Sequence, residues 1–294
     1  YPAAFCAALL GAQPMGFYSP QSLVADARRH GVEVRRPDVA VSAVQATLEP
    51  CGSSTGGVAV RLGLAAVRAL GESVAERIVA ARPFTDIEDL SRRAELDRPV
   101  LEALATAGAL SSFRDRSGRP FRRREATWVA GAAAAARPGQ LPGTVGVAES
   151  PRLPGMDPHE EVVADLWATG VSPSGHPVAS VRPMLDHRGV VPNAELVDHR
   201  DGERVLVAGI VTHRQRPSTA AGITFVNLED DTGLVNVVCS VGCWARFRSV
   251  LRSAPAVLIR GRLERTVDGV VNVVAERVEP LALVWTGSPA RDFR

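Results

Sequence analysis

Two hydrophobic periodicities divide this chain. Before Gly202, apolar side chains recur every three or four positions, which predicts helices, and beyond it they alternate every second position, which predicts strands. The chain opens with two predicted helices within residues 2–30, separated by a break at 13–20, and a short strand over 32–34. Turn-forming residues over 50–57 predict a first linker.

Helical spacing returns over residues 60–81 with a break at 69–71, which predicts a helix, a tight turn and a helix. Proline and glycine are frequent between residues 137 and 158, which indicates a linker. Further predicted helices are a second pair within 84–110, one over 121–137 and one over 160–169 that Gly170 ends. The predicted parts are an N-terminal region (1–49), a helical domain (58–136), a linker (137–157), a connector (158–201), a strand domain (202–282) and a tail (283–294).

The strand domain has the element order of an OB-fold barrel. A helix over 244–253 separates the third predicted strand from the fourth, as in that five-stranded antiparallel barrel. The strands are predicted over 204–213, 223–229, 234–241, 256–265 and 270–278. The fold class is therefore a multidomain α + β chain whose barrel type commonly binds single-stranded nucleic acid or sugars.

Composition excludes several classes of protein. With 294 residues, 46% of them hydrophobic, the chain can bury the cores of two or three domains, which excludes general disorder. Its longest apolar stretches fall far short of the roughly 20 residues that span a membrane, so no membrane partner is expected. Four cysteines make no disulfide framework, which favours a cytoplasmic protein. The start at Tyr1-Pro2 predicts a fragment that lacks its N-terminal part.

Basic residues are unevenly distributed, although the net charge is only +2. All 34 basic residues are arginines; the guanidinium suits phosphate contacts, although a GC-rich genome also explains the absence of lysine. Residues 113–137 carry seven arginines against two acidic residues. These arginines either follow a phosphate backbone or form a solvated basic face. The candidate contacts are Arg114, Arg116, Arg119, Arg122, Arg123 and Arg124.

Residues 60–78 resemble a helix-hairpin-helix motif, in which backbone N–H groups and a helix N-terminus contact a DNA phosphate. Gly71 would permit the close approach, and the neighbouring Arg68 is a further candidate contact. Ala69 stands where such a hairpin has its first glycine, which predicts a weaker approach at that point. An ordinary helical hairpin with a glycine turn has the same pattern. The second pair is more degenerate and is expected to pack against the first.

A nucleic-acid groove is predicted on the barrel. Strand alternation turns Arg260 and Arg262 away from the core, and it turns Phe225 outward, either as a base-stacking platform or as a packing contact. Arg214 and Arg216, in the first inter-strand loop, would complete the groove. The expected inward positions are Thr224, Val226, Leu228, Val257, Ile259, Gly261 and Leu263.

The sequence contains no recognisable catalytic or metal constellation. Asp230 and Asp231 belong to a predicted hairpin turn and are interpreted as turn formers. Cys239 and Cys243 have no second pair at metal spacing, which favours a structural role, and His176 is expected to be a hydrogen-bonding loop residue. We therefore expect no catalytic residue, metal or cofactor within these residues.

Several segments together resemble the C-terminal part of bacterial C-family DNA polymerases, the class of the replicative polymerase III alpha subunit. Residues 1–10 are similar to the end of that family's fingers region. Five segments resemble the error-prone branch of that family. They are AQPMGFYSP at 12–20, DARRHGVEV at 26–34, GHP at 175–177, LEDDTGLVNVV at 228–238 and RDFR at 291–294. The resemblance covers nearly the whole chain.

This resemblance implies a DNA-directed DNA polymerase that synthesises past damaged bases. It places the Mg²⁺-binding palm carboxylates outside these residues, so the stretch by itself is expected to be inactive. It also implies that the hairpins grip primer-template duplex and that the barrel meets single-stranded template. Gln13, Met15 and Tyr18 would lie near the incoming nucleotide or template.

The resemblance also implies recruitment partners. Residues 140–144 only begin like a sliding-clamp peptide, so we expect an indirect link to the clamp through accessory proteins of a mutagenesis complex. Two alternatives remain at this point. A protein-interaction scaffold is favoured by the near-zero net charge, and a fragment of a replicative polymerase is disfavoured by residues 13–18.

Overall fold

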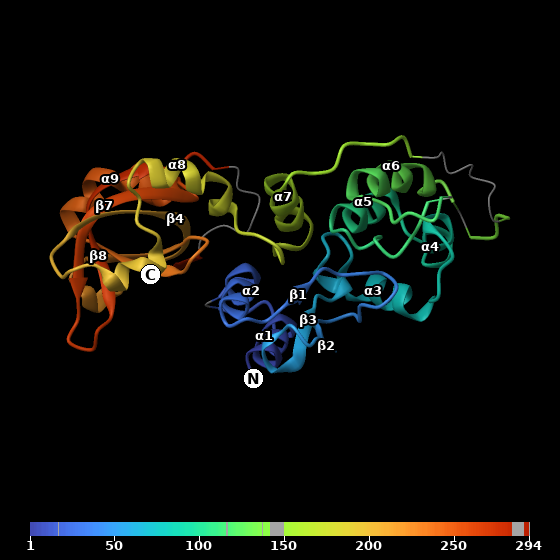
Figure 1. The fold of residues 1–294 in the computed structure, drawn as a ribbon, viewed down its shortest axis with the longest axis horizontal. Helices are drawn as coiled ribbons and strands as arrows, with labels where there is room; N and C mark the ends of the chain where they lie inside the picture. Colours follow the sequence, from blue (N-terminus) through green and yellow to red (C-terminus); the bar gives the residue numbers. More distant parts are fainter. Residues whose placement is uncertain (17, 116, 137, 142–149, 284–290, 294) are drawn as a thin grey trace. The chain divides into compact units, whose positions relative to one another are not determined.

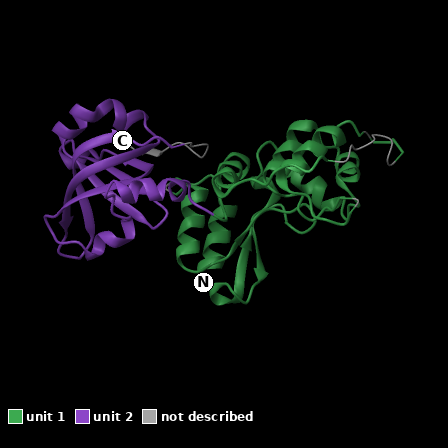
Figure 2. Cartoon of the chain, turned by 45° about the horizontal axis from the view of Figure 1, so that its top comes forward, with its two compact units in different colours: residues 1–174 green, residues 175–294 purple. Residues whose placement is uncertain are grey.

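The computed structural model describes residues 1–294 except 17, 116, 137, 142–149, 284–290 and 294. The chain forms two compact units, residues 1–174 and 175–294 (Figure 2). The predicted connector is therefore divided, because its helix belongs to the first unit and its remainder to the second.

The first unit opens with two helices and a small sheet (Figure 1). The helices are α1 (Pro2–Gly11) and α2 (Pro20–Arg29), and the strands are β1 (Val34–Arg35), β2 (Thr47–Pro50) and β3 (Val58–Arg61), in the order β1-β3-β2. Both helices agree with the prediction. Ser19 caps α2 by accepting the N–H of Ser22 at 3.1 Å, which explains where that helix begins.

Two predictions in this region are wrong. Residues 50–57 are not a linker but the turn of the antiparallel β2–β3 pair, which includes the short 3₁₀ helix η1 (Thr55–Gly57) and the buried Cys51. The helix expected from Val60 is instead β3, which pairs with both β1 and β2. Its β-branched Val60 is fully buried in the core beneath α1 and α2. Of the predicted helix only the 3₁₀ helix η2 (Leu64–Ala66) remains.

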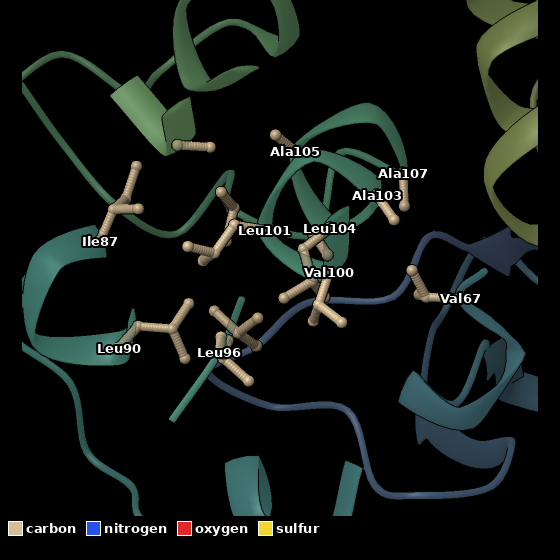
Figure 3. Packing of buried hydrophobic residues seen from close by; sticks show 14 of the residues in the cluster. Val67, Ile87, Leu90, Leu96, Val100, Leu101, Ala103, Leu104, Ala105 and Ala107 are labelled. Atoms are coloured by element: carbon tan, nitrogen blue, oxygen red, sulfur yellow. The ribbon is translucent and has the colours of Figure 1, made fainter. Parts of the chain in front are cut away.

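A helical bundle completes the first unit. Its helices are α3 (Gly71–Ala80), α4 (Ile87–Arg93), α5 (Arg98–Thr106), α6 (Arg123–Ala133) and α7 (Pro158–Thr169). Figure 3 shows Leu90, Leu96 and Leu101 in one cluster, so α4, α5 and the turn between them share a core. As predicted, α7 ends at Gly170, whose φ is +70°.

The second unit contains a closed barrel with short helices before it. The helical elements are η3 (Pro177–Val181), α8 (Arg182–His187), η4 (Asn193–Asp198), η5 (Ser218–Ala220) and α9 (Val241–Ser253). The strands are β4 (Arg204–Gln215), β5 (Thr224–Glu229), β6 (Leu234–Cys239), β7 (Ala256–Arg265), β8 (Val271–Pro280) and β9 (Arg291–Phe293).

The strand order is that of an OB-fold. It runs β5-β6-β8-β7-β4, and β4 also pairs with β5, which closes the barrel. The five predicted strands and the helix between the third and fourth are confirmed, whereas β9, parallel to β4, was not predicted. The expected inward residues of β5 and β7 are buried. At the inward Gly261, a Cβ would lie 2.4 Å from the carbonyl oxygen of Val274, so only glycine permits this approach of β7 and β8.

Candidate nucleic-acid interface

The first hairpin comprises residues 67–71, between η2 and α3. Ala69 and Gly71 both have φ near +65°, and Leu70 between them is buried in the helical core. The helix α3 begins at Gly71 without a side-chain cap, and a Cβ on Gly71 would meet no atom within 4 Å. The first turn of α3 therefore presents backbone N–H groups at an unobstructed surface, which is the arrangement that binds a phosphate.

A second hairpin, between α4 and α5, resembles the first at two of its three central positions. The backbone differs at the third, where Gly71 has φ +65° and Asp97 has φ −86°. Glu95 has φ +53° at the place of Ala69, and the buried Leu96 corresponds to Leu70. Where the first hairpin has Gly71, the second has Asp97, whose carboxylate accepts the N–H of Val100 at 3.1 Å. A carboxylate thus occupies the helix N-terminus and repels an approaching phosphate. In keeping with the sequence interpretation, the second hairpin packs in the shared core.

Arg68 joins the first hairpin to α7. Its guanidinium lies over the ring of Trp167, 5.0 Å from the centroid, and its backbone N–H donates to the carbonyl of Ala168 at 2.7 Å. The side chain remains exposed at the surface. Arg68 thus has a packing role beside the hairpin as well as the position that the sequence suggested for a DNA contact.

The structure brings Arg122, Arg123 and Arg124 together at the start of α6, but two of them are engaged by α7. Arg123 forms an ion pair with Asp165, which is 2% exposed, and Arg124 pairs with Glu160 at 2.5 Å. These acids neutralise much of the charge that the sequence assigned to a phosphate track. Arg122 is exposed and precedes α6.

The other arginines of this run make local contacts. Arg119 pairs with the buried Glu125 at 3.0 Å, and Arg114 donates to the carbonyl of Gly118 at 3.3 Å. Arg116 lies outside the described residues. Most of the clamp-like segment and of the C-terminal tail lies outside them too.

The segment between α1 and α2 is a turn held by the side chain of Gln13. Its Nε2 donates to the carbonyl of Tyr18 at 3.4 Å, and its Oε1 accepts the N–H of Met15 at 3.2 Å. Tyr18 is 51% exposed and Phe17 lies outside the described residues. The three candidate residues therefore lie in one surface turn, and Gln13 shapes its backbone.

On the barrel, strand register aligns Phe225 with Arg262. Phe225 pairs with Val238 of β6, Val238 with Val274 of β8, and Val274 with Arg262 of β7. Directly paired residues share a face, so these four side chains form one outward row, about 14 Å long at three strand spacings. Arg262 is exposed and the other three are half-buried. The row thus carries an aromatic ring at one end and a guanidinium at the other.

Amides and further arginines border this outward row. Asn227, Asn236 and Asn272 form the neighbouring row, in which Nδ2 of Asn236 donates to Oδ1 of Asn272 at 2.8 Å. Arg260 is exposed on β7 opposite Arg277 of β8. Arg277 is paired with Glu279 at 2.9 Å, so Arg260 is the less engaged of the two.

Arg214 does not belong to a groove, contrary to the prediction. It lies within β4 rather than in a loop and is 8% exposed. Its Nε donates to the carbonyl of Leu251 at 2.5 Å and its Nη2 to that of Ala254 at 2.9 Å, so it satisfies carbonyl groups at the end of α9. Arg216, two residues later, is exposed.

The remaining sequence candidates have structural roles. Asp230 accepts the N–H groups of Thr232 and Gly233, both at 2.8 Å, which confirms it as a turn former, and it also pairs with Arg182 at 2.7 Å. Nδ1 of His176 accepts the N–H of Val178 at 3.2 Å, as a loop hydrogen-bonding residue does. No group of three or more potential metal ligands occurs among the described residues.

Cys239, at the end of β6, and Cys243, in the first turn of α9, affect each other's pKa. A hydrogen bond between them lowers the pKa of Cys243 and raises that of Cys239, and burial raises the pKa of Cys239 further. Arg246 contributes to the lower pKa of Cys243. Cys239 belongs to the barrel core and Cys243 packs against it, which fits a structural role.

Comparisons with known proteins agree with this geometry. A family model described as a helix-hairpin-helix motif matches residues 31–119, and one described as an OB-fold nucleic acid binding domain matches residues 205–281. None of the helices in the described part of the chain has the length and apolar character needed to cross a membrane.

Curated relatives match the entire chain. An error-prone DNA polymerase of Nocardia farcinica is 57% identical over 300 residues, and one of Mycobacterium tuberculosis is 55% identical over 298 residues. One of Corynebacterium glutamicum is 48% identical over 295 residues. Each alignment covers 100% of this chain and 26% of the relative, so the chain spans about a quarter of their length. With a helix-hairpin-helix region and an OB-fold barrel in place, and this identity along its whole length, the chain is homologous to part of the error-prone DNA polymerases.

Proposed function

We propose that this chain is the DNA-binding C-terminal portion of an error-prone DNA polymerase that acts in translesion synthesis and damage-induced mutagenesis. The first hairpin binds the backbone of primer-template duplex, and the outward row binds single-stranded template. The palm carboxylates and their Mg²⁺ belong to other parts of the full polymerase, so this chain binds DNA without catalysis. Such a role belongs in the cytoplasm, the location that the cysteine content favours.

The uncapped start of α3 is the observation that carries this proposal. A helix N-terminus attracts phosphate through its dipole and its free N–H groups, and this contact ignores base sequence, as a polymerase requires. The contrast between Gly71 and Asp97 supports a contact at the first hairpin, because a carboxylate caps α5 whereas no side chain caps α3. The second hairpin then supports the first by sharing its core.

The outward row suits a single strand for two reasons. Phe225 offers a ring on which a base can stack, and the guanidinium of Arg262 offers two N–H donors to the oxygens of a phosphate. The asparagine row beside it supplies donors and acceptors that tolerate any base. This chemistry supports template binding without sequence preference.

Fluorescence anisotropy of labelled DNA tests the duplex contact. A primed template with a single-stranded overhang and a blunt duplex are titrated at two salt concentrations. Gly71→Asp places a carboxylate where the phosphate would lie, whereas Gly71→Asn adds a side chain of the same size without charge, and both residues tolerate positive φ. We expect Gly71→Asp to weaken blunt-duplex binding about tenfold more than Gly71→Asn. Equal affinities for the two variants would contradict the hairpin contact.

The overhang tests the barrel. We expect Phe225→Ala to cost about 1–3 kcal/mol of overhang binding, with Phe225→Leu as the control that retains bulk. Arg262→Ala is expected to reduce the slope of log affinity against log salt by about 0.7, the value for one phosphate of a single strand. Unchanged overhang binding in both variants would place the single-strand site elsewhere.

Partners beyond DNA follow from the same proposal. Accessory proteins of a mutagenesis complex bind this region and link it indirectly to the sliding clamp. A scaffold function is the second candidate, favoured by the acids of α7 that neutralise Arg123 and Arg124. Absence of DNA binding at low salt would select the scaffold.

A further inference from the structure

An arginine-lined cavity of about 410 Å³ lies in the first unit, apart from the first hairpin. We call it the arginine pocket. Its walls come from the start of α6, the end of α5, the ends of β1 and β3, and the segment that precedes α7. Its basic residues are Arg36, Arg61, Arg122, Arg123 and Arg124, and Glu161 is the acid among its lining residues.

Carboxylates at the back of the pocket hold three of these guanidinium groups in place. Asp165 forms ion pairs with Arg36 and Arg123. Glu49 accepts hydrogen bonds from Nε and Nη2 of Arg61 at 2.8 and 2.9 Å. Gly108, with φ +74°, leaves room for them, because a Cβ there would lie 3.0 Å from Nε of Arg123. These long side chains are therefore already ordered in the free protein, so a ligand would not have to order them on binding.

Arg122 and Arg124 keep donors for a ligand. A guanidinium has five N–H groups, and Arg124 uses one nitrogen, for Glu160. Arg122 is exposed and forms no ion pair with any residue in the described part of the chain. Both lie at the start of α6, where the carboxylate of Glu125 accepts the backbone N–H of Arg122 at 3.0 Å and is paired with Arg119.

The charge balance sets the class of ligand. Five arginines face the four carboxylates Glu49, Glu160, Glu161 and Asp165, which leaves one net positive charge. A single phosphate gains little there, whereas a chain of phosphates spans several forks. The pocket also has apolar walls, from Leu110, Phe121, Pro154 and Met156, and its volume lies within the range of small-molecule sites.

We propose that the arginine pocket binds the phosphates of a nucleoside polyphosphate, with Arg122 and Arg124 as the closing contacts and the apolar wall against the base. The site is independent of the DNA contact at Gly71. A polymerase fragment with such a site has an affinity for free nucleotides outside the catalytic palm.

Isothermal titration of the chain with ATP, inorganic tripolyphosphate and adenosine, without metal and at low salt, tests the pocket. We expect ATP to bind more tightly than tripolyphosphate, and adenosine not to bind. Arg122→Glu, at an exposed position, and the double variant Arg122→Ala with Arg124→Ala are each expected to weaken ATP about tenfold or more. Arg98→Ala removes an arginine of α5 outside the pocket and is the matched control.

Three results would overturn the proposal. Absence of ATP and tripolyphosphate binding to the unaltered chain leaves the pocket without a ligand. If Arg98→Ala weakens ATP binding as much as the pocket variants do, ATP is attracted to arginines in general and not to the pocket. Displacement of ATP by blunt duplex assigns the pocket to the DNA backbone instead. Gly71→Asp is expected to leave ATP affinity unchanged while duplex affinity falls, which separates this proposal from the hairpin contact.

Discussion

Asp165 of α7 and Arg123 of α6 form an ion pair that is nearly inaccessible to water, with 2% and 9% of the two side chains exposed. Asp165 also accepts Arg36 Nε at 3.2 Å and Ser172 Oγ at 3.2 Å. One carboxylate therefore connects α7 to α6 and to the segment after β1. This relationship explains why the arginine run of α6 is less basic in the folded chain than in the sequence.

We predict that Asp165→Ala destabilises the first unit by about 3 kcal/mol, because the buried guanidinium of Arg123 loses its counter-charge and the partly exposed Arg36 retains only Glu161. Hydrogen exchange followed by mass spectrometry on peptides of α6 and α7 measures this loss. Glu102→Ala is the control, since its pair with Arg98 is exposed to solvent and contributes little to stability. Similar losses in both variants would show that Asp165 has no special role.

Ala69→Gly is expected to stabilise the first unit by about 1 kcal/mol. Ala69 has φ +65°, where a Cβ is strained and glycine is not. Ala66, also exposed but not left-handed, provides the comparison, and Ala66→Gly should destabilise by about 0.5–1 kcal/mol. Thermal unfolding of both variants shows whether each substitution raises or lowers the stability. A destabilising Ala69→Gly would contradict the hairpin geometry.

The small sheet is expected to lose stability in acid. A hydrogen bond from Arg35, with others from Cys51 and Ser53, lowers the pKa of Glu33 to about 2, and a hydrogen bond from Arg61 lowers that of Glu49. A carboxyl group whose pKa is lower in the folded state stabilises it above the ordinary value, near 4.5, and this contribution disappears as the pH falls toward 2. Urea unfolding between pH 7 and pH 2.5 measures the decline.

Arg35→Ala tests the cause of that decline. The variant should be less stable at pH 7 but lose less on acidification, because Glu33 then titrates closer to its ordinary pKa. Carbon-detected NMR titration of the Glu33 carboxyl group gives the pKa directly. An unchanged Glu33 pKa in the variant would rule out Arg35 as the main cause.

Cys243 is expected to react with iodoacetamide before Cys6 and Cys239. Its pKa is lowered by the hydrogen bond from Cys239 and by Arg246, whereas burial and Asp26 raise the pKa of Cys6 to about 11. Peptide mass spectrometry at pH 7.5 gives the order of labelling. Arg246→Ala should slow the labelling of Cys243 severalfold, and faster labelling of Cys6 would contradict the assignment.

Local sequence accounts for most elements of this fold. Alternation over five segments, with a helix between the third and fourth, predicts the barrel because a strand with one buried face must alternate. The same alternation correctly turns Phe225, Arg260 and Arg262 outward. Glycine at 170 and serine at 19 mark a helix end and a helix start through contacts within a few residues.

Partners distant in the sequence decided the rest. Val58–Arg61 has the spacing of a helix but becomes β3 because β1 and β2 offer it hydrogen bonds on both edges. The sequence predicts Arg214 as a loop residue, and only its hydrogen bonds to the end of α9 explain its burial. Asp165 engages Arg123 across 42 positions. Such contacts have no local signal.

The sequence by itself determined the family, the barrel, and which barrel side chains face outward, because these depend on local propensity and on motifs that are contiguous in the chain. Only the tertiary structure decided which of those side chains lie together. Register across β6 and β8 places Phe225 in one row with Arg262, and a carboxylate at the second hairpin leaves the first with the open helix N-terminus. The physical reason is that both depend on pairing and packing between segments whose separation along the chain carries no information about their distance in space.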